Sequence, residues 1–351
     1  GLILVLIGLL FTEPMLRLMN TPDILFHESA TYMKIIFIGM IPTSLYNMAS
    51  AILRAVGDSR RPLIFLIIAA VVNLILDMIL VAGLGLGVTG AAWATFAAQT
   101  VSAILAITTL ARSDTPYRLF LKEIHFDKEM SLSILKIGIP AGLQSAVVSS
   151  ANTIVQSQIN AYGYRVIEGY AAESRINGFF FMTVNSFSLA MTTFVGQNIG
   201  AHQYHRVKKG IRMALGLGCG LVFLLGIIVF GFQREFLALF NVHEESIQYG
   251  MQMLSITCIF YFLFGIGDIL SGVFRGAGNA FFPMLSAIIN MFGVRILWVF
   301  LAQQVHPDPI SVFLSYPVSW VTMALTMLIY YRSGRWMPRE MKLYTQVEKE
   351  V

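Results

Sequence analysis

Long apolar runs separated by short polar turns make up most of this chain. A helix needs about 20 apolar residues to cross the hydrocarbon core of a bilayer. Runs of that size predict a partial span at 1–12 and nine full spans, at 31–53, 62–82, 88–111, 132–160, 167–200, 209–232, 247–273, 283–302 and 309–331. Turn residues mark the boundaries, as in the stretch from Gly57 to Pro62. The pattern therefore predicts an all-α polytopic membrane protein.

Composition supports this prediction and excludes several classes of protein. The chain has 351 residues, of which 56% are hydrophobic and 12% are charged. Soluble domains carry about 25% charged residues, so these charges are too few to cover a soluble particle. The composition excludes a cytosolic enzyme and a nucleic-acid-binding protein, and the many apolar residues exclude disorder. We expect the lipid bilayer and a small molecule as partners, no nucleic acid, and a monomer.

The positive residues indicate the orientation. When successive loops are assigned to opposite sides of the membrane, 18 of the 24 Lys and Arg residues fall on one side and four on the other. Arg175 and Arg295 lie within predicted spans. Cytoplasmic loops carry the excess of positive charge, so the richer side and the C-terminus are predicted to be cytoplasmic.

An internal repeat relates two parts of the chain. A shift of 221 residues lays 50–62 onto 271–283 without a gap. The aligned residues are Arg54 with Arg275, Gly57 with Gly278, and Pro62 with Pro283. Six predicted spans separate the copies, so both face the same way, as in the parallel repeats of secondary transporters. We therefore expect two six-helix lobes, twelve spans in the intact protein, and about ninety residues ahead of Gly1.

The longest polar connector divides the expected lobes. It carries eight charged residues between 112 and 131. The predicted domains are the remainder of an N-terminal lobe at 1–111, a cytoplasmic linker at 112–131, a C-terminal lobe at 132–333, and a cytoplasmic tail at 334–351.

Three motifs in this order resemble the multidrug and toxic compound extrusion (MATE) transporters. They are LRAVGD at 53–58, IPAGLQ at 139–144 and VGQNIGA at 195–201. The resemblance covers essentially the whole chain, from the family's third helix to its last. It implies two six-helix lobes around a central cavity and a place in the cytoplasmic (inner) membrane. It also implies drug export in exchange for Na⁺ or H⁺, without enzyme activity or a resident cofactor.

One carboxylate deep in a span is the main candidate for function. A charge at the centre of a membrane helix costs about 2.5–3.5 kcal/mol, and Asp77 lies in the run VVNLILDMIL. Asn73 shares its helix face, and at about 1.5 Å per residue Thr95 reaches a similar depth on the next span. Oxygen ligands suit Na⁺, so the three predict a cation-coupling site, with a purely structural hydrogen-bond cluster as the alternative. The MATE resemblance implies the same site, with a further Asp on the family's first helix.

The second lobe holds further polar residues within spans. The candidates are Asp268, Glu173, Arg295, Asn152, Gln156 and Asn177. Glu173 and Arg295 come to a similar depth below the outer face, so a neutralising pair is a hypothesis. Such a pair would either lock the packing of the lobe or contact substrate. Asn152, Gln156 and Asn177 are candidates to line a cavity.

Other motifs carry no chemistry. The stretch from Gly85 to Gly90 matches G-x-G-x-x-G, but it joins two spans and lacks the preceding strand of a dinucleotide site. Cys219 and Cys258 lie in apolar runs without metal-ligand spacing.

The sequence thus favours a secondary exporter of cationic or amphiphilic small molecules that works by alternating access. The nearest alternative is a flippase for lipid-linked oligosaccharides on a related fold, which would need several basic residues in its cavity. A membrane-embedded enzyme would need a catalytic constellation at one depth. A receptor or scaffold would not account for a duplicated bundle with buried acids.

Overall fold

The computed structural model describes residues 1–18, 22–240 and 242–350, and the chain divides into two compact units, Gly1–Phe126 and Asp127–Val351. Residues 19–21, 241 and 351 fall within the predicted domains but lie outside the described residues. Unit 1 contains α1 (Leu2–Leu18), α2 (Asp23–Ile38), α3 (Met40–Ala55), α4 (Arg60–Asp77), the π-helix η1 (Met78–Gly83), α5 (Gly87–Ala111) and the 3₁₀-helix η2 (Leu121–Glu123). Unit 2 contains α6 (Lys128–Asn160), α7 (Tyr164–Gly200), α8 (Tyr204–Gly231), α9 (Gln233–Ala238), α10 (Glu244–Gly276), α11 (Phe281–Ser286), the π-helix η3 (Ala287–Val294), α12 (Arg295–Val305), α13 (Pro309–Phe313), α14 (Ser315–Arg332) and α15 (Arg339–Glu350).

The helices confirm the predicted membrane architecture. Within the described residues, nine helical segments are long and apolar enough to cross a membrane, and each overlaps one predicted full span. Eight agree with the predicted bounds within five residues, and the ninth, Asp23–Ala55, starts eight residues before its predicted span. The described residues contain no strand. A helix satisfies its own backbone hydrogen bonds, which an apolar bilayer requires. The predicted partial span at 1–12 is a longer helix, α1, which ends at Leu18.

One predicted span, 31–53, is part of a longer segment made of two helices. α2 ends at Ile38 and α3 begins at Met40, with Gly39 between them. Pro42 lies in the first turn of α3. Its ring has no N–H to donate to the Ile38 carbonyl and crowds that carbonyl, so the helix is interrupted at this point.

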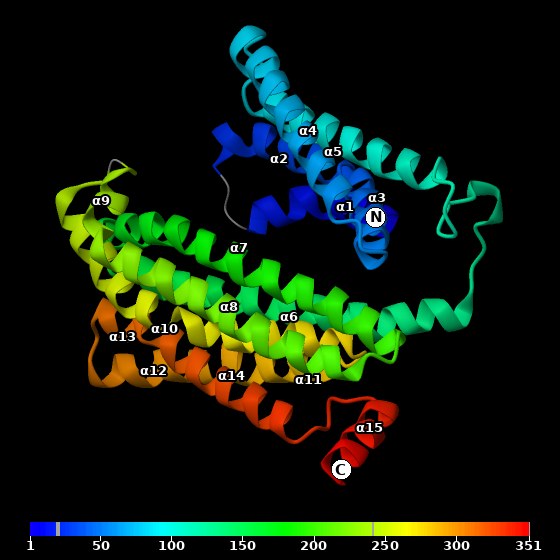
Figure 1. Ribbon diagram of the computed structural model, residues 1–351. Coiled ribbons are helices and arrows are strands. Elements are labelled where there is room, and N and C mark those ends of the chain that lie inside the picture. Colours follow the sequence, from blue (N-terminus) through cyan, green and yellow to red (C-terminus); the bar gives the residue numbers. More distant parts are fainter. Residues whose placement is uncertain (19–21, 241, 351) are drawn as a thin grey trace. The chain divides into compact units, whose positions relative to one another are not determined.

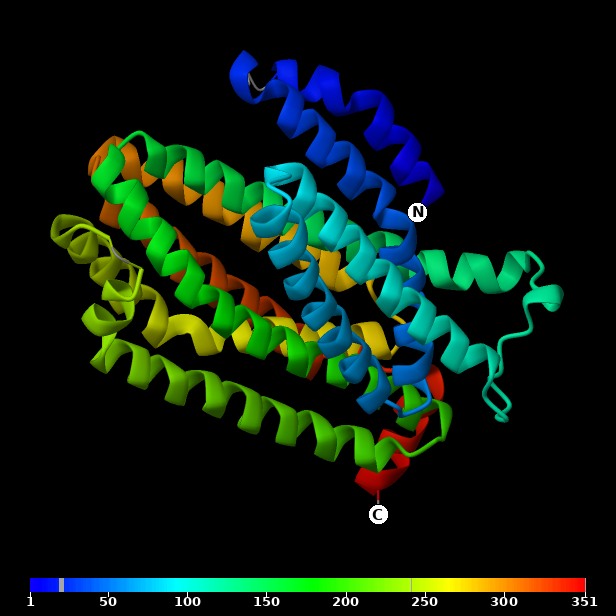
Figure 2. The ribbon, with the colours of Figure 1, turned by 90° about the horizontal axis from the view of Figure 1, so that it is seen from above.

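Unit 1 packs α3, α4 and α5 around a small apolar core. Tyr46, Leu53, Phe65 and Leu110 are among its buried residues. α4 and α5 run side by side, as Figure 2 shows in its blue-cyan segments. In the most apolar part of the α4–η1 segment, only 11% of the residues are buried inside the structure. Most of its side chains are therefore available to contact lipid.

Unit 2 is built around α10, which lies against α7, α8 and α14 (Figure 1). Small residues allow α7 and α10 to approach closely, as is common between membrane helices. A Cβ atom on Gly272 would lie 2.1 Å from the Ser188 carbonyl oxygen. The Ser188 hydroxyl donates to the Asp268 carbonyl at 2.7 Å, and the Thr192 hydroxyl donates to the Gly272 carbonyl at 3.1 Å.

The internal repeat has the same backbone geometry in both copies. Gly57 and Gly278 both have positive φ, 91° and 85°, immediately after a helix. In each copy the glycine N–H donates to the backbone carbonyl of the arginine three residues earlier. The N–H of the following residue donates to the backbone carbonyl five positions before it. These are the two bonds of a Schellman cap, which favours glycine. The aligned motif therefore encodes one local structure, used in both units.

The boundary between the two units lies within the predicted linker. The division after Phe126 falls within 112–131, and α6 starts at Lys128, a few residues before the predicted lobe at 132. The assignment of the units to two transporter lobes stays a prediction. The predicted tail contains α15, where Glu340 Oε2 accepts a hydrogen bond from the Tyr204 hydroxyl at 3.0 Å.

Candidate functional site

Two of the predicted cation-coupling residues lie one turn apart near the end of α4. Asn73 and Asp77 are half-buried. The Asn73 Nδ2 and Asp77 Oδ1 atoms are buried, and neither has a hydrogen-bond partner in the described part of the chain. A buried polar atom without a partner costs about 1–3 kcal/mol. The pair is therefore open to a ligand that would satisfy it.

The third residue, Thr95, lies on α5 at a depth between them. A Cβ atom on Gly90 would lie 3.1 Å from the Leu80 carbonyl oxygen, which sets the register of the two antiparallel helices. At about 1.5 Å per residue, Asp77 is about 4.5 Å and Asn73 about 10.5 Å along α4 from this contact. Thr95 is about 7.5 Å along α5 in the same direction. Along the helix axes the three residues therefore lie within about 6 Å of one another, and the meeting of their side chains stays a prediction.

The oxygen atoms of these residues are of the kind that a hard monovalent cation binds. The Thr95 hydroxyl donates to the Ala91 carbonyl at 3.0 Å, so its lone pairs stay available. Half a turn of the Asn73 amide would direct its carbonyl oxygen to the side now taken by Nδ2. In the described residues, no group of three or more His, Cys, Asp or Glu side chains is placed to hold a metal ion. A cation here would therefore rely on one carboxylate and neutral oxygens.

The backbone after Asp77 is unusual. The π-helix η1 begins at Met78 and continues to Gly83. π-helical turns inside α-helices are rare and are found frequently at functional sites. This turn lies directly beside the carboxylate and is not evident from the residue pattern.

Unit 2 places Glu173 in a polar cluster between α7 and α10. The side chain is fully buried. Its Oε1 atom accepts hydrogen bonds from the Asn177 amide and, at 3.3 Å, from the Thr257 hydroxyl. The Glu173 Oε2 and Asn177 Oδ1 atoms are buried without a partner among the described residues. Each of the two hydrogen-bonded side chains therefore keeps one acceptor oxygen without a donor in the described part of the chain.

Arg295 is also buried, but the hypothesis of a direct pair with Glu173 is wrong. Its Nη1 donates to Asn152 Oδ1 at 2.7 Å, and its Nε and Nη2 donate to Ser319 Oγ at 3.0 and 2.8 Å. The guanidinium carbon lies 4.5 Å from the centre of the Tyr316 ring. No ion pair joins Arg295 to Glu173 in the described part of the structure. Neutral oxygens and an aromatic face satisfy the guanidinium instead.

A hydrogen bond nevertheless joins Tyr316, over which Arg295 lies, to the helix that carries Glu173. The Tyr316 hydroxyl is 2.9 Å from the hydroxyl of Tyr170, which precedes Glu173 by three residues on α7. Several of these side chains surround a cavity of about 310 Å³. The lining residues are Asn152, Tyr170, Glu173, Ser174, Asn177, Gly178, Phe181, Met253, Tyr261, Tyr316 and Trp320. Three of the six polar candidates in unit 2 thus line one aromatic cavity, and Arg295 contacts its wall.

The remaining two candidates lie elsewhere. Gln156 donates to Asn160 Oδ1 at 2.9 Å and is not among the residues that line the cavity. Asp268 is half-buried on α10. Arg275, seven residues later on the same helix, donates to Gln144 Oε1 at 3.1 Å and to the Ser188 hydroxyl at 2.9 Å. This cluster ties α6, α7 and α10 together.

Sequence reasoning missed the aromatic residues of the cavity. Tyr170 and Tyr316 carry hydroxyls in apolar surroundings, and Tyr316 and Trp320 are spaced by four residues on α14. That spacing places them on one helix face, but it is equally typical of core packing. The Gly85 and Gly87 positions, by contrast, form the turn between η1 and α5 with φ of 67° and 52°, as predicted.

Comparison with known proteins identifies the family of the chain. The model of the MatE family matches residues 1–79 and 140–301. The probable multidrug resistance protein YoeA of Bacillus subtilis is 30% identical over 344 residues, which cover 95% of this chain and 73% of the relative. The probable multidrug resistance protein YpnP of the same organism is 28% identical over 346 residues, covering 97% and 75%.

Solved structures show the same fold. A crystal structure of MATE in complex with MaL6 matches with a TM-score of 0.89 at 19% identity. The match covers 95% of this chain and 75% of that chain.

Proposed function

The chain belongs to the MatE family of efflux transporters, and from this premise we propose that Asp77 couples export to a Na⁺ or H⁺ gradient. Asn73 and Thr95 complete the site. The substrates are cationic or amphiphilic small molecules, in keeping with the multidrug resistance named for the relatives. The chain is a multi-pass membrane protein. We place it in the cytoplasmic membrane with its C-terminus inside, and we propose that it acts as a monomer.

One observation carries this proposal. Among the residues that the structure describes, Asp77 Oδ1 and Asn73 Nδ2 are buried without partners in the most apolar membrane segment. A membrane helix retains such atoms at a cost of about 1–3 kcal/mol each. A bound cation or proton would offset that cost at the Asp77 carboxylate during part of a transport cycle. At Asn73 a cation does so only once the amide has turned its carbonyl oxygen to that side. Binding to only one of two conformations would then bias alternating access between them.

We also propose that the cavity of unit 2 takes the cationic part of a substrate. Glu173 is one of its lining residues and keeps one oxygen without a partner among the described residues, and Tyr170, Tyr261 and Trp320 supply aromatic faces. A carboxylate with aromatic rings suits an organic cation. Because Arg295 bonds to Asn152 and Ser319, it does not neutralise this carboxylate.

The alternatives fit less well. A flippase for pyrophosphate-linked sugars would need several basic residues in its cavity, and no Lys or Arg lines the 310 Å³ cavity of unit 2. The named relatives, which are multidrug resistance proteins, give that alternative no support. They give none to an enzyme or a scaffold either.

The test is dye efflux from inverted vesicles that carry the protein. Asp77→Asn keeps the shape of the side chain and removes its charge, so we expect it to abolish ethidium transport driven by a Na⁺ or pH gradient. Glu123→Gln is the matched control, because Glu123 is an exposed acid of the linker. Transport by Asp77→Asn at the wild-type rate would exclude the coupling role. Applying the Na⁺ and pH gradients separately identifies the ion.

A further inference from the structure

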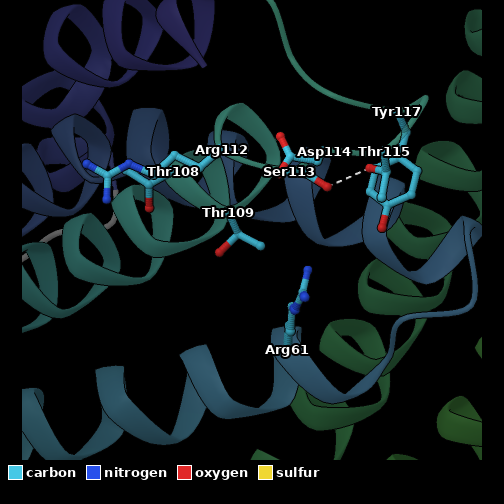
Figure 3. Close-up of a pocket in the computed structure, with 8 residues that line it drawn as sticks. All are labelled: Arg61, Thr108, Thr109, Arg112, Ser113, Asp114, Thr115 and Tyr117. Carbon is cyan, nitrogen blue, oxygen red and sulfur yellow. Dashed lines mark hydrogen bonds between the residues drawn. The ribbon is translucent and has the colours of Figure 1, made fainter.

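A polar pocket of about 560 Å³ opens in unit 1 where α4 begins and α5 ends. Figure 3 shows Arg61 extending from α4 toward Thr109 and the segment that follows α5. The lining residues are Arg61, Thr108, Thr109, Arg112, Ser113, Asp114, Thr115 and Tyr117. None of them takes part in the transport role proposed above. The pocket therefore needs an explanation of its own.

Two arginines in this pocket have unused donors. The side chain of Arg112 makes no hydrogen bond or ion pair within the described residues. Arg61 has one ion pair, from its Nε to Asp58 Oδ2 at 3.3 Å, and its guanidinium makes no hydrogen bond in the same part of the chain. Two guanidinium groups with free N–H donors suit a phosphate group, which accepts several such bonds at once.

The local charge favours an anion in spite of two acids. Asp58 is paired with Arg61 and also accepts the Arg61 backbone N–H at 3.1 Å. Asp114 lies 4.0 Å from Arg118, and its side chain is 99% exposed, so water screens it. The segments 58–61 and 112–118 together hold four arginines and two aspartates, which leaves an excess of two positive charges.

The hydroxyl groups of the pocket favour a ligand that also carries hydrogen-bond donors. Thr108 and Thr109 donate their hydroxyl protons to the Ile104 and Leu105 carbonyls, each at 2.7 Å. Their oxygens therefore offer only lone pairs to a ligand, which must bring donors of its own. Ser113 and Thr115 share one hydrogen bond of 2.5 Å, which leaves one of their two hydroxyl protons available (Figure 3). An anion that also carries hydroxyl groups satisfies both sets.

The surroundings indicate a lipid as the source of that anion. Above Arg61, α4 exposes Leu63, Ile64 and Ile67 at 57%, 41% and 55%. These apolar side chains follow Arg61 within two turns of the helix, in a segment apolar enough to cross the membrane, where acyl chains would contact them. The pocket also lies at the ends of α4 and α5 that the positive-inside rule assigns to the cytoplasm, where basic pockets bind the headgroups of anionic lipids.

We propose that this pocket binds the headgroup of an anionic glycerophospholipid of the phosphatidylglycerol type. Arg61 and Arg112 bind the phosphodiester, and the glycerol hydroxyls donate to Thr108 and Thr109. The binding site is separate from the coupling residues. It ties the cytoplasmic ends of α4 and α5 to the membrane surface.

Native mass spectrometry of the purified full chain, titrated with phosphatidylglycerol or phosphatidylethanolamine, tests the proposal. We expect Arg61→Gln and Arg112→Gln each to weaken phosphatidylglycerol binding about tenfold, the size of one charge-assisted contact. Arg60→Gln is the matched control, because it removes the same charge one residue away and does not line the pocket. Equal losses in Arg60→Gln and Arg61→Gln would show diffuse surface attraction and overturn the proposal, as would wild-type binding by both pocket variants.

Two further measurements separate the remaining explanations. Thr109→Val should reduce the preference for phosphatidylglycerol over phosphatidic acid, which has no glycerol headgroup, and an unchanged preference would refute the role of the threonines. Soluble glycerol 1-phosphate should compete only weakly. If it binds as tightly as the lipid, the site serves a soluble phosphate and the lipid proposal is wrong. Circular dichroism confirms that each variant is folded before binding is compared.

Discussion

The contact between α7 and α10 makes a quantitative prediction about stability. Gly272 of α10 lies against the α7 backbone, where an added Cβ atom would be 2.1 Å from the Ser188 carbonyl oxygen. A carbon–oxygen contact normally measures about 3.3 Å or more, so Gly272→Ala would push the two helices apart locally by about 1 Å. The obstacle is backbone rather than a flexible side chain, and it has no rotamer with which to move away.

Opposing contributions determine how far Gly272→Ala lowers the free energy of unfolding. Alanine in place of glycine favours a helix by about 1 kcal/mol, whereas overpacking costs about 1–3 kcal/mol. Separation of the helices would also weaken the hydrogen bonds that Ser188 and Thr192 donate across this contact, each worth about 0.6 kcal/mol in membrane proteins. The net expectation is a loss of about 1–3 kcal/mol in the free energy of unfolding.

Gly265→Ala is the matched control on the same helix. Its Cβ would meet the Cys219 Sγ and Val184 Cγ2 atoms at 3.7 Å, an ordinary contact. Both variants gain the same helix propensity, so the difference between them reports the clash alone. Thermal unfolding in detergent should give Gly272→Ala a Tm several degrees below that of Gly265→Ala. If the two variants unfold at the same temperature, the close contact is not what holds α7 against α10.

Two predictions concern the polar network of unit 2. Arg295→Lys keeps the charge but loses the planar fork that bonds Asn152 and Ser319 and lies over Tyr316. We expect a loss of about 2–4 kcal/mol in unfolding free energy by thermal denaturation, and an unchanged Tm would show that the fork is dispensable. Tyr316→Phe removes the 2.9 Å bond to the Tyr170 hydroxyl and should cost about 1 kcal/mol. The double variant with Tyr170→Phe tests the pairing. Its loss of unfolding free energy must be smaller than the sum of the losses of the two single variants, because both remove the same hydrogen bond.

The sequence by itself determined the architecture and half of one site. Apolar runs of membrane length place eight of the nine spans within five residues of the helices, because a segment in lipid must satisfy its backbone locally. The capping motif at 50–62 and 271–283 is equally local, since the positive φ of Gly57 and Gly278 depends on neighbouring residues only. Asn73 and Asp77 share a face for the same reason, as residues four apart on any helix do.

Only the tertiary structure decided what the polar residues contact. Glu173 and Arg295 come to a similar depth along their helices, yet Arg295 bonds to Asn152 and Ser319 rather than to the acid. Depth follows from counting residues, whereas rotation about the helix axis and the choice of neighbour depend on packing against other helices. The π-helix after Asp77 and the aromatic cavity beside Glu173 are likewise features that only the tertiary structure shows. Helical periodicity specifies one helix at a time, and contacts between helices are set when the units fold.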